Sequence, residues 1–235
     1  MRTEAVRLYL GLEHECSYLP KRNARSAFVD PALALDAEQY GELLALGFRR
    51  SGEFVYRPAC LGCRQCIPSR VPVADFQPQR SHRRCLTRNA DLQWLRQSRL
   101  GPEHFALYRR YLKARHADGG MDADDEEAFH RFLDGVWPGT EIWSLNKEQQ
   151  LLAVAVVDVV PEGLSAVYTF FEPDADDRGL GTFSILQQIA EAQRRGLRYL
   201  YLGYWIPDCQ KMAYKARFRP LQILQDNHWQ ALTSP

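Results

Sequence analysis

"EIWSLNKEQQLLAVAVVDVVPEGLSAVYTFF", residues 141–171, is the stretch of sequence that decides the fold. It contains three strand-like runs, at 141–145, 151–160 and 165–171, and short turns separate them. The middle run is apolar on both faces, so we expect it to lie in the centre of a sheet. Connections this short predict antiparallel pairing of the three strands.

The residues that follow predict a helical crossover. The loop "EPDADDRGLG" (172–181) leads into a helix expected over 182–195, and "RYLYLGYWI" (198–206) is expected to be another strand. A helical segment at 209–218 and a short strand at 221–225 complete the order. A strand, a helix and a strand in succession predict a parallel pair, so we expect a mixed sheet with helices and the fold class α+β.

This order is similar to the GNAT-type acyltransferase fold, in which backbone N–H groups at the start of the crossover helix hold a pyrophosphate. Gly179 and Gly181, next to Arg178, stand where that cradle lies. Asp176 replaces the usual glutamine or arginine of the motif, and further carboxylates at 174 and 177 would repel a pyrophosphate. The loop therefore matches the fold in position and departs from it in charge, which disfavours coenzyme A.

The residues before 141 predict smaller elements. Asp36 and Gln39 have the spacing of a capping box, so we expect a helix to begin there and to end at Gly47. The other expected elements are strands at 4–11 and 53–58, helices at 102–116 and 124–137, and either irregular backbone or a strand leading into a helix at 79–99.

Length and composition set the broad class. The chain has 235 residues, of which 46% are hydrophobic and 25% charged, as in ordinary globular proteins of one large domain or two small ones. No stretch resembles a signal peptide or reaches the roughly 18 apolar residues of a membrane span, so we expect a cytoplasmic protein without membrane contact. The net charge of +1 does not indicate a nucleic-acid binder, although residues 79–99 and 211–219 are locally basic.

The cysteines are concentrated in one block, "YRPACLGCRQCIPSRVPV" (56–73). Cys60, Cys63 and Cys66 are spaced C-x-x-C-x-x-C, Cys16 precedes them, and Cys85 and Cys209 stand apart. In a reducing compartment such a cluster favours metal binding, catalysis or buried thiols over disulfides. Four thiolates could hold zinc or an iron–sulfur cluster, and the alternative is a group of buried free thiols.

Four blocks together carry a resemblance to a known family: "CSYLPKRNARSAF" (16–28), "GFRRSGEFVYRPACLGCRQCIPSRVPVADFQPQRSHRR" (47–84), "YTFFEP" (168–173) and "YLGYWIPDCQKMAYKARFRP" (201–220). The chain resembles the bacterial branch of the arginyl-tRNA–protein transferase family. This resemblance implies transfer of leucine from leucyl-tRNA to the α-amine of proteins that begin with Asp or Glu, which marks them for N-degron proteolysis.

The resemblance also implies an architecture and a cofactor question. It implies an N-terminal cysteine-bearing region, expected over residues 1–100, that recognises the acceptor, and a GNAT-like aminoacyltransferase region over 101–235. Eukaryotic relatives have been linked to iron–sulfur binding through equivalent cysteines, and Leu19 here stands where they have a second cysteine. The donor ester is already activated, so no cofactor is required for the transfer itself.

Specific roles follow from this family assignment. An acidic acceptor side chain needs a cation, and Arg57, Arg64 and Arg70 flank the cysteines, while Lys21 and Arg22 follow Cys16. In the C-terminal block, Tyr204 or Tyr214 could protonate the leaving ribose oxygen, and Asp208 could orient the amine. The residues expected to contact the donor tRNA are Lys211, Lys215, Arg178, Gly179 and Gly181, and the two lysines are expected to share one exposed helix face.

Three alternatives remain open at this point. Arginine could be the donor amino acid, since the choice of leucine rests on resemblance alone. The chain could be a coenzyme A-dependent N-acetyltransferase. It could also be a non-enzymatic RNA-binding module, because its basic runs are interleaved with aromatic residues such as Trp94 and Phe218.

Overall fold

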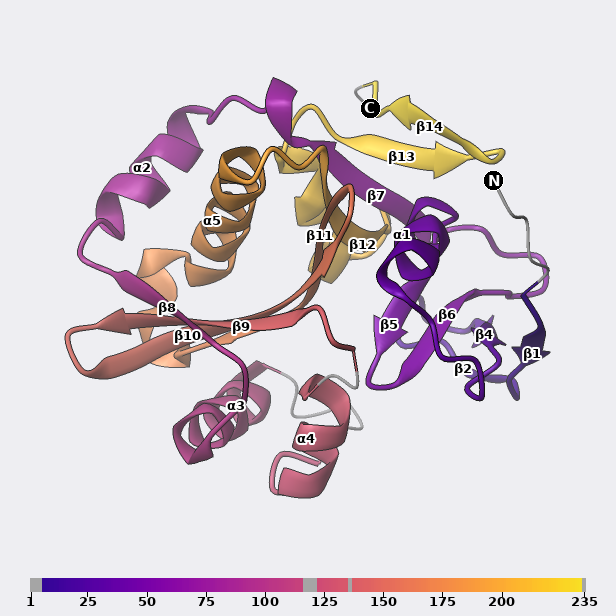
Figure 1. The fold of residues 1–235 in the computed structure, drawn as a ribbon, viewed down its shortest axis with the longest axis horizontal. Helices are drawn as coiled ribbons and strands as arrows, with labels where there is room; N and C mark the ends of the chain where they lie inside the picture. Colours follow the sequence, from indigo (N-terminus) through magenta and orange to yellow (C-terminus); the bar gives the residue numbers. More distant parts are fainter. Residues whose placement is uncertain (1–5, 116–121, 135–136, 234–235) are drawn as a thin grey trace.

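The computed structural model describes residues 6–115, 122–134 and 137–233. Within them, a large mixed sheet has the strand order β14-β13-β7-β12-β11-β10-β9-β8 (Figure 1). Its strands are β7 (Ile67–Pro72), β8 (Gln93–Gln97), β9 (Thr140–Lys147), β10 (Gln150–Val160), β11 (Gly163–Phe171), β12 (Tyr199–Trp205), β13 (Gln222–Gln225) and β14 (His228–Ala231). The predicted α+β fold class is confirmed.

The predicted three-strand meander forms the middle of this sheet. β9, β10 and β11 pair in antiparallel fashion, and β10 lies between the other two. Residues 152–158 of β10 are all buried, which explains why this run is apolar on both faces. Helix α5 (Leu180–Arg194) then crosses to β12, which pairs in parallel with β11. The expected mixed sheet is therefore present.

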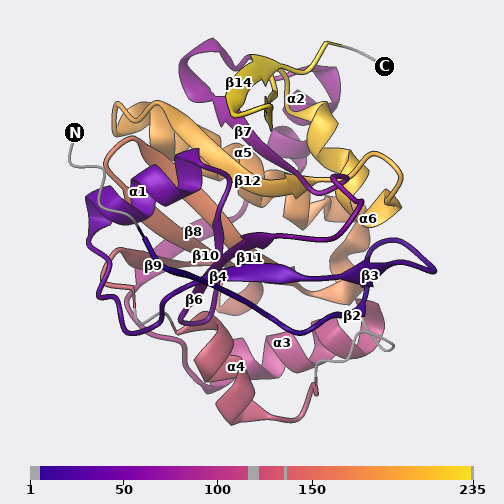
Figure 2. The ribbon, with the colours of Figure 1, turned by 90° about the vertical axis from the view of Figure 1, so that its right-hand side faces the viewer.

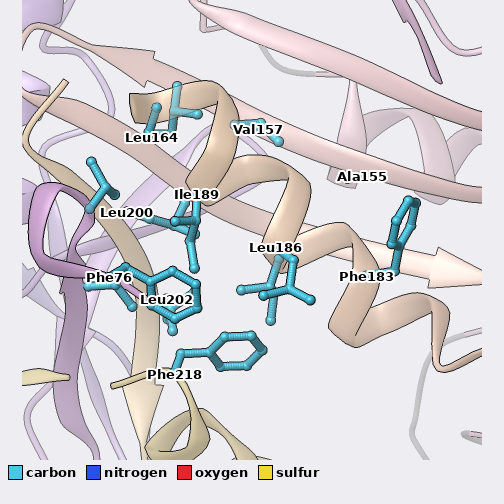
Figure 3. Close-up of a cluster of buried hydrophobic side chains, with 14 of the residues drawn as sticks. Phe76, Ala155, Val157, Leu164, Phe183, Leu186, Ile189, Leu200, Leu202 and Phe218 are labelled. Carbon is cyan, nitrogen blue, oxygen red and sulfur yellow. The ribbon is translucent and has the colours of Figure 1, made fainter. Parts of the chain in front are cut away.

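Helices cover both faces of the large sheet. α5 and α2 (Arg80–Arg88) lie on one face, and α3 (Pro102–Arg115) and α4 (Glu126–Leu133) lie on the other (Figure 1). Figure 3 shows Leu186 and Ile189 of α5 on the side of the helix toward Leu164 and Leu200 of the parallel strands, and Phe183, nearer the start of the helix, beside Ala155 of β10. The apolar residues recur every three to four positions, so one helix stripe faces the sheet.

The N-terminal residues build a separate four-stranded sheet of β1 (Leu8–Leu10), β4 (Ser26–Val29), β6 (Phe54–Pro58) and β5 (Arg49–Ser51). A short hairpin of β2 (His14–Glu15) and β3 (Asn23–Ala24) extends toward helix α6 (Gln210–Ala213) (Figure 2). Helix α1 (Ala37–Ala45) has the predicted capping box, in which the Asp36 carboxylate accepts from the Gln39 amide at 2.8 Å and the Gln39 side chain accepts from the Asp36 amide at 3.0 Å.

A buried ion pair joins the two sheets. The Arg50 guanidinium on β5 donates to both carboxylate oxygens of Asp158 on β10, each at 2.8 Å, and these side chains are 3% and 0% exposed. Tyr40 of α1 donates to the same carboxylate at 3.0 Å, and Thr140 donates at 2.7 Å. Every oxygen of the buried charge is thus hydrogen-bonded, which is the condition for burying it.

Several expectations about the elements are wrong. Residues 79–99 form α2 and then β8, which is the reverse of the expected strand and helix. β7 was not expected at all, because its sequence holds two prolines and an arginine. The helix expected over 124–137 ends at Leu133, and residues 135–136 lie outside the described part.

The large sheet also crosses the expected division at residue 100. β7 and β8 come from the first hundred residues and join the sheet that the later residues build. The separate sheet ends at Pro58. The division into 1–100 and 101–235 stays a prediction about function and does not coincide with the two sheets. In the described residues, no helix has the length and apolar character needed to cross a membrane.

Candidate active site

Strands β11 and β12 part after a short paired stretch. They pair only where Gly163–Ser165 faces Tyr199–Tyr201, and both strands continue beyond it without a further register between them in the described residues. We call the region between residues 166–171 and 202–205 the splay. Its facing edges carry backbone groups that the pairing of these two strands leaves unused, so they can bind an incoming chain.

Arg49 of β5 reaches into the splay from the N-terminal sheet. Its Nη2 donates to the carbonyl oxygen of Val167 on β11 at 2.8 Å, and its guanidinium lies beside β12 at Gly203. Gly203 has φ +72, and a Cβ there would lie 2.5 Å from Nη1 of Arg49. A glycine is therefore required at this position, both for the backbone conformation and for the approach of the arginine.

The C-terminal block lies against the same place, but its tyrosines differ in availability. Tyr204 is 2% exposed, and its hydroxyl donates to the carbonyl oxygen of Gly47 at 3.1 Å and to that of Tyr56 at 3.4 Å. This hydroxyl is committed to the N-terminal region. Tyr214 is 38% exposed, and no hydrogen bond of its hydroxyl is present among the described residues. Tyr214 is thus the hydroxyl that remains available for chemistry, and Asp208 is exposed in the turn before it.

The two lysines do not share an exposed face, so that prediction is wrong. α6 ends at Ala213 and a 3-10 turn follows over Tyr214–Arg217, which changes the angle between successive residues. Lys211 stays exposed, whereas Lys215 is 4% exposed. The Lys215 ammonium group donates to the carbonyl oxygen of Tyr204, and burial lowers its pKa well below the ordinary value. Lys215 is therefore placed to hold the end of β12 rather than a phosphate in solvent.

The loop before α5 is fixed by an ion pair. Both terminal nitrogens of Arg178 donate to the carboxylate of Asp91, at 2.8 and 2.9 Å, and this pairing holds the pKa of Asp91 well below its usual range. Gly179 is the left-handed residue that precedes the helix, and Gly181 lies against Phe171 at the end of β11. The loop is present as expected, but the charge of Arg178 is already neutralised. Its role toward the donor, and that of the glycines, stays a prediction.

The three arginines expected to bind the acceptor have separate environments. Arg70 is 8% exposed and lies between the rings of Tyr199 and Trp229, 3.6 and 4.1 Å from their centroids. Its Nε donates to Gln222 at 2.8 Å. Arg57 is exposed and covers the ring of Phe48, and Arg64 is exposed in the cysteine loop. The structure does not gather them into one pocket, and their predicted role remains without support.

The cysteines gather at the end of β12. Cys16, Cys63 and Cys66 pack with Leu19 against Ile206 and Met212, and Cys209 belongs to this cluster although the sequence set it apart. Burial and the neighbouring thiols raise the pKa of Cys66 to about 12, so this side chain is a neutral thiol at neutral pH. Cys60 is one of these neighbouring thiols, and it also contacts the backbone of Arg25.

Among the described residues, no group of three or more His, Cys, Asp or Glu side chains is arranged to hold a metal ion. No chemical step is therefore derived from zinc or an iron–sulfur cluster. Metal binding by Cys16, Cys60, Cys63 and Cys66 stays a prediction.

A basic cavity of about 390 Å³ lies beside the cysteine loop. Lys21, Arg22 and Arg25 line it, together with Glu13. Arg22 donates to the thiol of Cys63 at 3.4 Å, and Arg25 donates to the carbonyl oxygen of Gly11 at 3.0 Å. This cationic cavity is separate from Arg49 in the splay, and it faces solvent beside the N-terminal hairpin.

Two family profiles match the chain, "Arginine-tRNA-protein transferase, N terminus" over residues 14–84 and "Arginine-tRNA-protein transferase, C terminus" over residues 103–225. The chain therefore belongs to the arginine-tRNA-protein transferase family, and it is a transferase. The expected family resemblance is confirmed. The N-terminal profile covers the four clustered cysteines of the sequence prediction, and the C-terminal profile covers α3 to β13.

Curated relatives are similar over nearly the whole chain. "Aspartate/glutamate leucyltransferase" of Pseudomonas aeruginosa is 47% identical over 234 residues, which is 98% of this chain and 100% of the relative. The protein of the same name from Alcanivorax borkumensis is 48% identical over 231 residues, which is 98% of this chain and 96% of the relative. Among solved structures, L-PGS from Bacillus licheniformis has a TM-score of 0.46 at 12% identity and covers 61% of this chain and 48% of its own, too low a similarity to bear on function.

Proposed function

We propose that this chain transfers leucine from leucyl-tRNA to the α-amine of proteins that begin with Asp or Glu. The observation that carries the proposal is the full-length similarity to relatives named aspartate/glutamate leucyltransferase. The product would begin with leucine, a destabilising N-terminal residue, and would enter N-degron proteolysis. Such a reaction belongs in the cytoplasm, where charged tRNA is found.

The chemistry needs positioning more than activation. The acceptor nitrogen attacks the ester carbonyl carbon, the bond to the ribose oxygen breaks, and the amine's proton is lost while the ribose oxygen gains one. An α-amine has an ordinary pKa of about 7.7–8.0, so a useful fraction is neutral near pH 7. The ester already carries the free energy of transfer, so no ATP or other cofactor takes part. The protein has to bring amine and ester together and exclude water.

The splay is the place that this chemistry fits best. The C-terminal block supplies Tyr214 as an available hydroxyl for the leaving ribose oxygen and Lys211 as an exposed cation for the tRNA. Asp208 is exposed and can hold the incoming ammonium group. Tyr204 and Lys215 are assigned a supporting role here, because their polar atoms already bind the backbone.

Features of the structure disfavour both rival functions. A pyrophosphate at the start of α5 would meet Asp174, Asp176 and Asp177, and Arg178 is paired with Asp91, which disfavours acetyl-coenzyme A. An RNA-binding module without activity would not need the available hydroxyl and the parted strands.

One assay separates these functions. The protein is incubated with a peptide that begins with Asp and with labelled leucyl-tRNA, labelled arginyl-tRNA or labelled acetyl-coenzyme A. We expect label in the peptide from leucyl-tRNA alone. Label from arginyl-tRNA or from acetyl-coenzyme A would replace the proposal by the corresponding alternative. Binding of leucyl-tRNA without any transfer would support the RNA-binding module.

A further inference from the structure

Arg49 is a cation that lacks an acidic partner. Among the described residues, no carboxylate lies within 4.0 Å of its guanidinium, and its one hydrogen bond goes from Nη2 to Val167. Among the described residues, its Nε and Nη1 donate no hydrogen bond, and the residue is half-buried. The next residue, Arg50, is saturated by Asp158. Two adjacent arginines on one strand therefore differ, and only Arg49 keeps donors for a ligand.

The surroundings of Arg49 favour an anion. The electrostatic neighbours of Arg49 are the hydroxyl groups of Tyr56, Tyr18, Tyr204 and Tyr40 and the buried amine of Lys215. Tyr18 is 38% exposed, and Tyr56 is half-buried. No hydrogen bond of the Tyr18 or Tyr56 hydroxyl is present among the described residues, so both can donate to a ligand. A guanidinium with two free donors and nearby hydroxyls matches the two oxygens of a carboxylate.

The reach of the acceptor selects this arginine over the others. In an N-terminal Asp or Glu, two or three carbon–carbon bonds separate the α-carbon from the carboxylate carbon of the side chain. The α-amine nitrogen and this carboxylate carbon therefore lie within about 5 Å of each other. A residue that binds the carboxylate must therefore lie beside the place where the amine meets the ester. Arg49 is in the splay, whereas Arg70 is enclosed by Tyr199 and Trp229.

We propose that Arg49 binds the side-chain carboxylate of the acceptor's N-terminal Asp or Glu, with Tyr18 and Tyr56 as additional donors. This inference rests on the proposed function and names the residue that makes it selective for acids. A carboxylate accepts hydrogen bonds from all of these groups, whereas an amide would place one NH₂ group against a donor. Asn and Gln are therefore rejected at this position.

The test compares acceptors in the full-length protein. Steady-state transfer from leucyl-tRNA is measured with peptides that begin with Asp, Glu, Asn or Gln, for the wild type, Arg49→Met, Arg49→Lys and Arg84→Met, a control at an exposed arginine of α2. For Arg49→Met we expect kcat/KM with the Asp peptide to fall about 10²-fold, mainly through KM, and the value with the Asn peptide to change less than about threefold. Arg49→Lys should keep part of the preference for Asp, because it keeps the charge but loses the planar fork. Arg84→Met should keep the wild-type ratio of Asp to Asn.

The outcomes distinguish the inference from its foundation. An active Arg49→Met or Arg49→Lys protein with the wild-type ratio of Asp to Asn would overturn the inference. If Arg49 instead holds a tRNA phosphate, the KM for leucyl-tRNA rises equally with every peptide and the ratio is unchanged, which also overturns it. If Arg49→Met does not fold, Arg49→Lys is decisive, and a folded protein is identified by its melting temperature. A wild-type protein that transfers no leucine at all would refute the proposed function itself.

Discussion

The large sheet and the N-terminal sheet are held in different ways. The large sheet has an extended apolar core beneath α5, formed by residues such as Leu164, Leu186 and Leu200. The N-terminal sheet packs on it through a smaller apolar cluster that includes Phe48 and Val160, and polar contacts from Arg50 to Asp158, from Arg49 to Val167 and from Tyr204 to Gly47 join the two sheets as well. Apolar packing tolerates change in many directions, whereas each polar contact depends on one partner. The candidate site therefore lies where single polar contacts join the two sheets.

Removing the Arg50 charge should have the largest effect on stability. Arg50→Met leaves the buried Asp158 carboxylate with hydroxyl partners only, and we expect a loss of about 3–5 kcal/mol in the free energy of unfolding. Urea unfolding measures it, with Arg57→Met as the exposed control, for which we expect less than about 0.5 kcal/mol. Amide exchange should increase in β4 to β6 before it increases in β10. A loss below about 1 kcal/mol for Arg50→Met would contradict the assigned attachment.

A cavity in the large core should cost somewhat less and act on the whole molecule. Leu186 is 3% exposed and packs between α5 and the sheet, so Leu186→Ala should destabilise by about 2–4 kcal/mol. Leu46→Ala, at a residue 58% exposed, is the matched control. We expect amide exchange in β10 and in the N-terminal sheet to increase together. Faster exchange in the N-terminal sheet alone would show that the two regions do not differ as described.

The two tyrosines of the C-terminal block should separate chemistry from attachment. Tyr214→Phe removes the available hydroxyl, and we expect single-turnover transfer from leucyl-tRNA to slow by roughly 10²-fold with little change in stability. Tyr204→Phe removes a hydroxyl bound to the carbonyl of Gly47, and we expect about 1 kcal/mol of lost stability with a rate near wild type. The reverse pattern would exchange the two roles.

Acid should weaken the ion pairs of Glu191, which lie between α5 and the large sheet and do not involve the N-terminal sheet. Hydrogen bonds from Arg194, followed by Arg195 and the charge of Arg96, lower the pKa of Glu191 from 4.5 to about 2. The ionised carboxylate therefore contributes stability that is complete above pH 4.5 and is lost as the pH falls toward 2. The free energy of unfolding is measured with urea between pH 2.5 and 6. As the pH falls, it should decrease less steeply in Glu191→Gln than in the wild type, and at pH 6 the variant should be less stable by about 1 kcal/mol after solvent screening. Parallel curves for the two proteins would show that Glu191 is not linked to folding.

The same contrast explains how far the sequence predicts the structure. The strands at 151–160 and 165–171 and the helix after Gly179 follow from local patterns, because each buries a continuous apolar face. The capping box at Asp36 follows from a local pattern too, because it needs only Asp36 and Gln39 at a spacing of three residues. β7 was not visible, since its prolines argue against a central strand and its place depends on pairing with β12 and β13.

The candidate site was only partly predictable. The C-terminal block was located correctly, but periodicity could not show that Lys215 is buried and Lys211 exposed, because the helix changes its form at Tyr214. Arg49 was missed, since its partner Val167 is 118 positions away and the neighbouring Arg50 has the same residue type. Contacts between distant segments decide which of two equal side chains is available, and a local pattern does not contain that information.

The N-terminal sheet is proposed to bind the acceptor through Arg49, and the C-terminal block to bind the tRNA through Lys211. Kinetics in which both substrate concentrations are varied test these two roles. Initial rates are measured over a range of leucyl-tRNA and Asp-peptide concentrations for the wild type, Arg49→Lys and Lys211→Ala. We expect Arg49→Lys to raise only the KM for the peptide. We expect Lys211→Ala to raise only the KM for leucyl-tRNA and to reduce the slope of its affinity against log salt concentration by about one phosphate contact. A rise of both constants in both variants, or the exchange of the two effects, would contradict these roles.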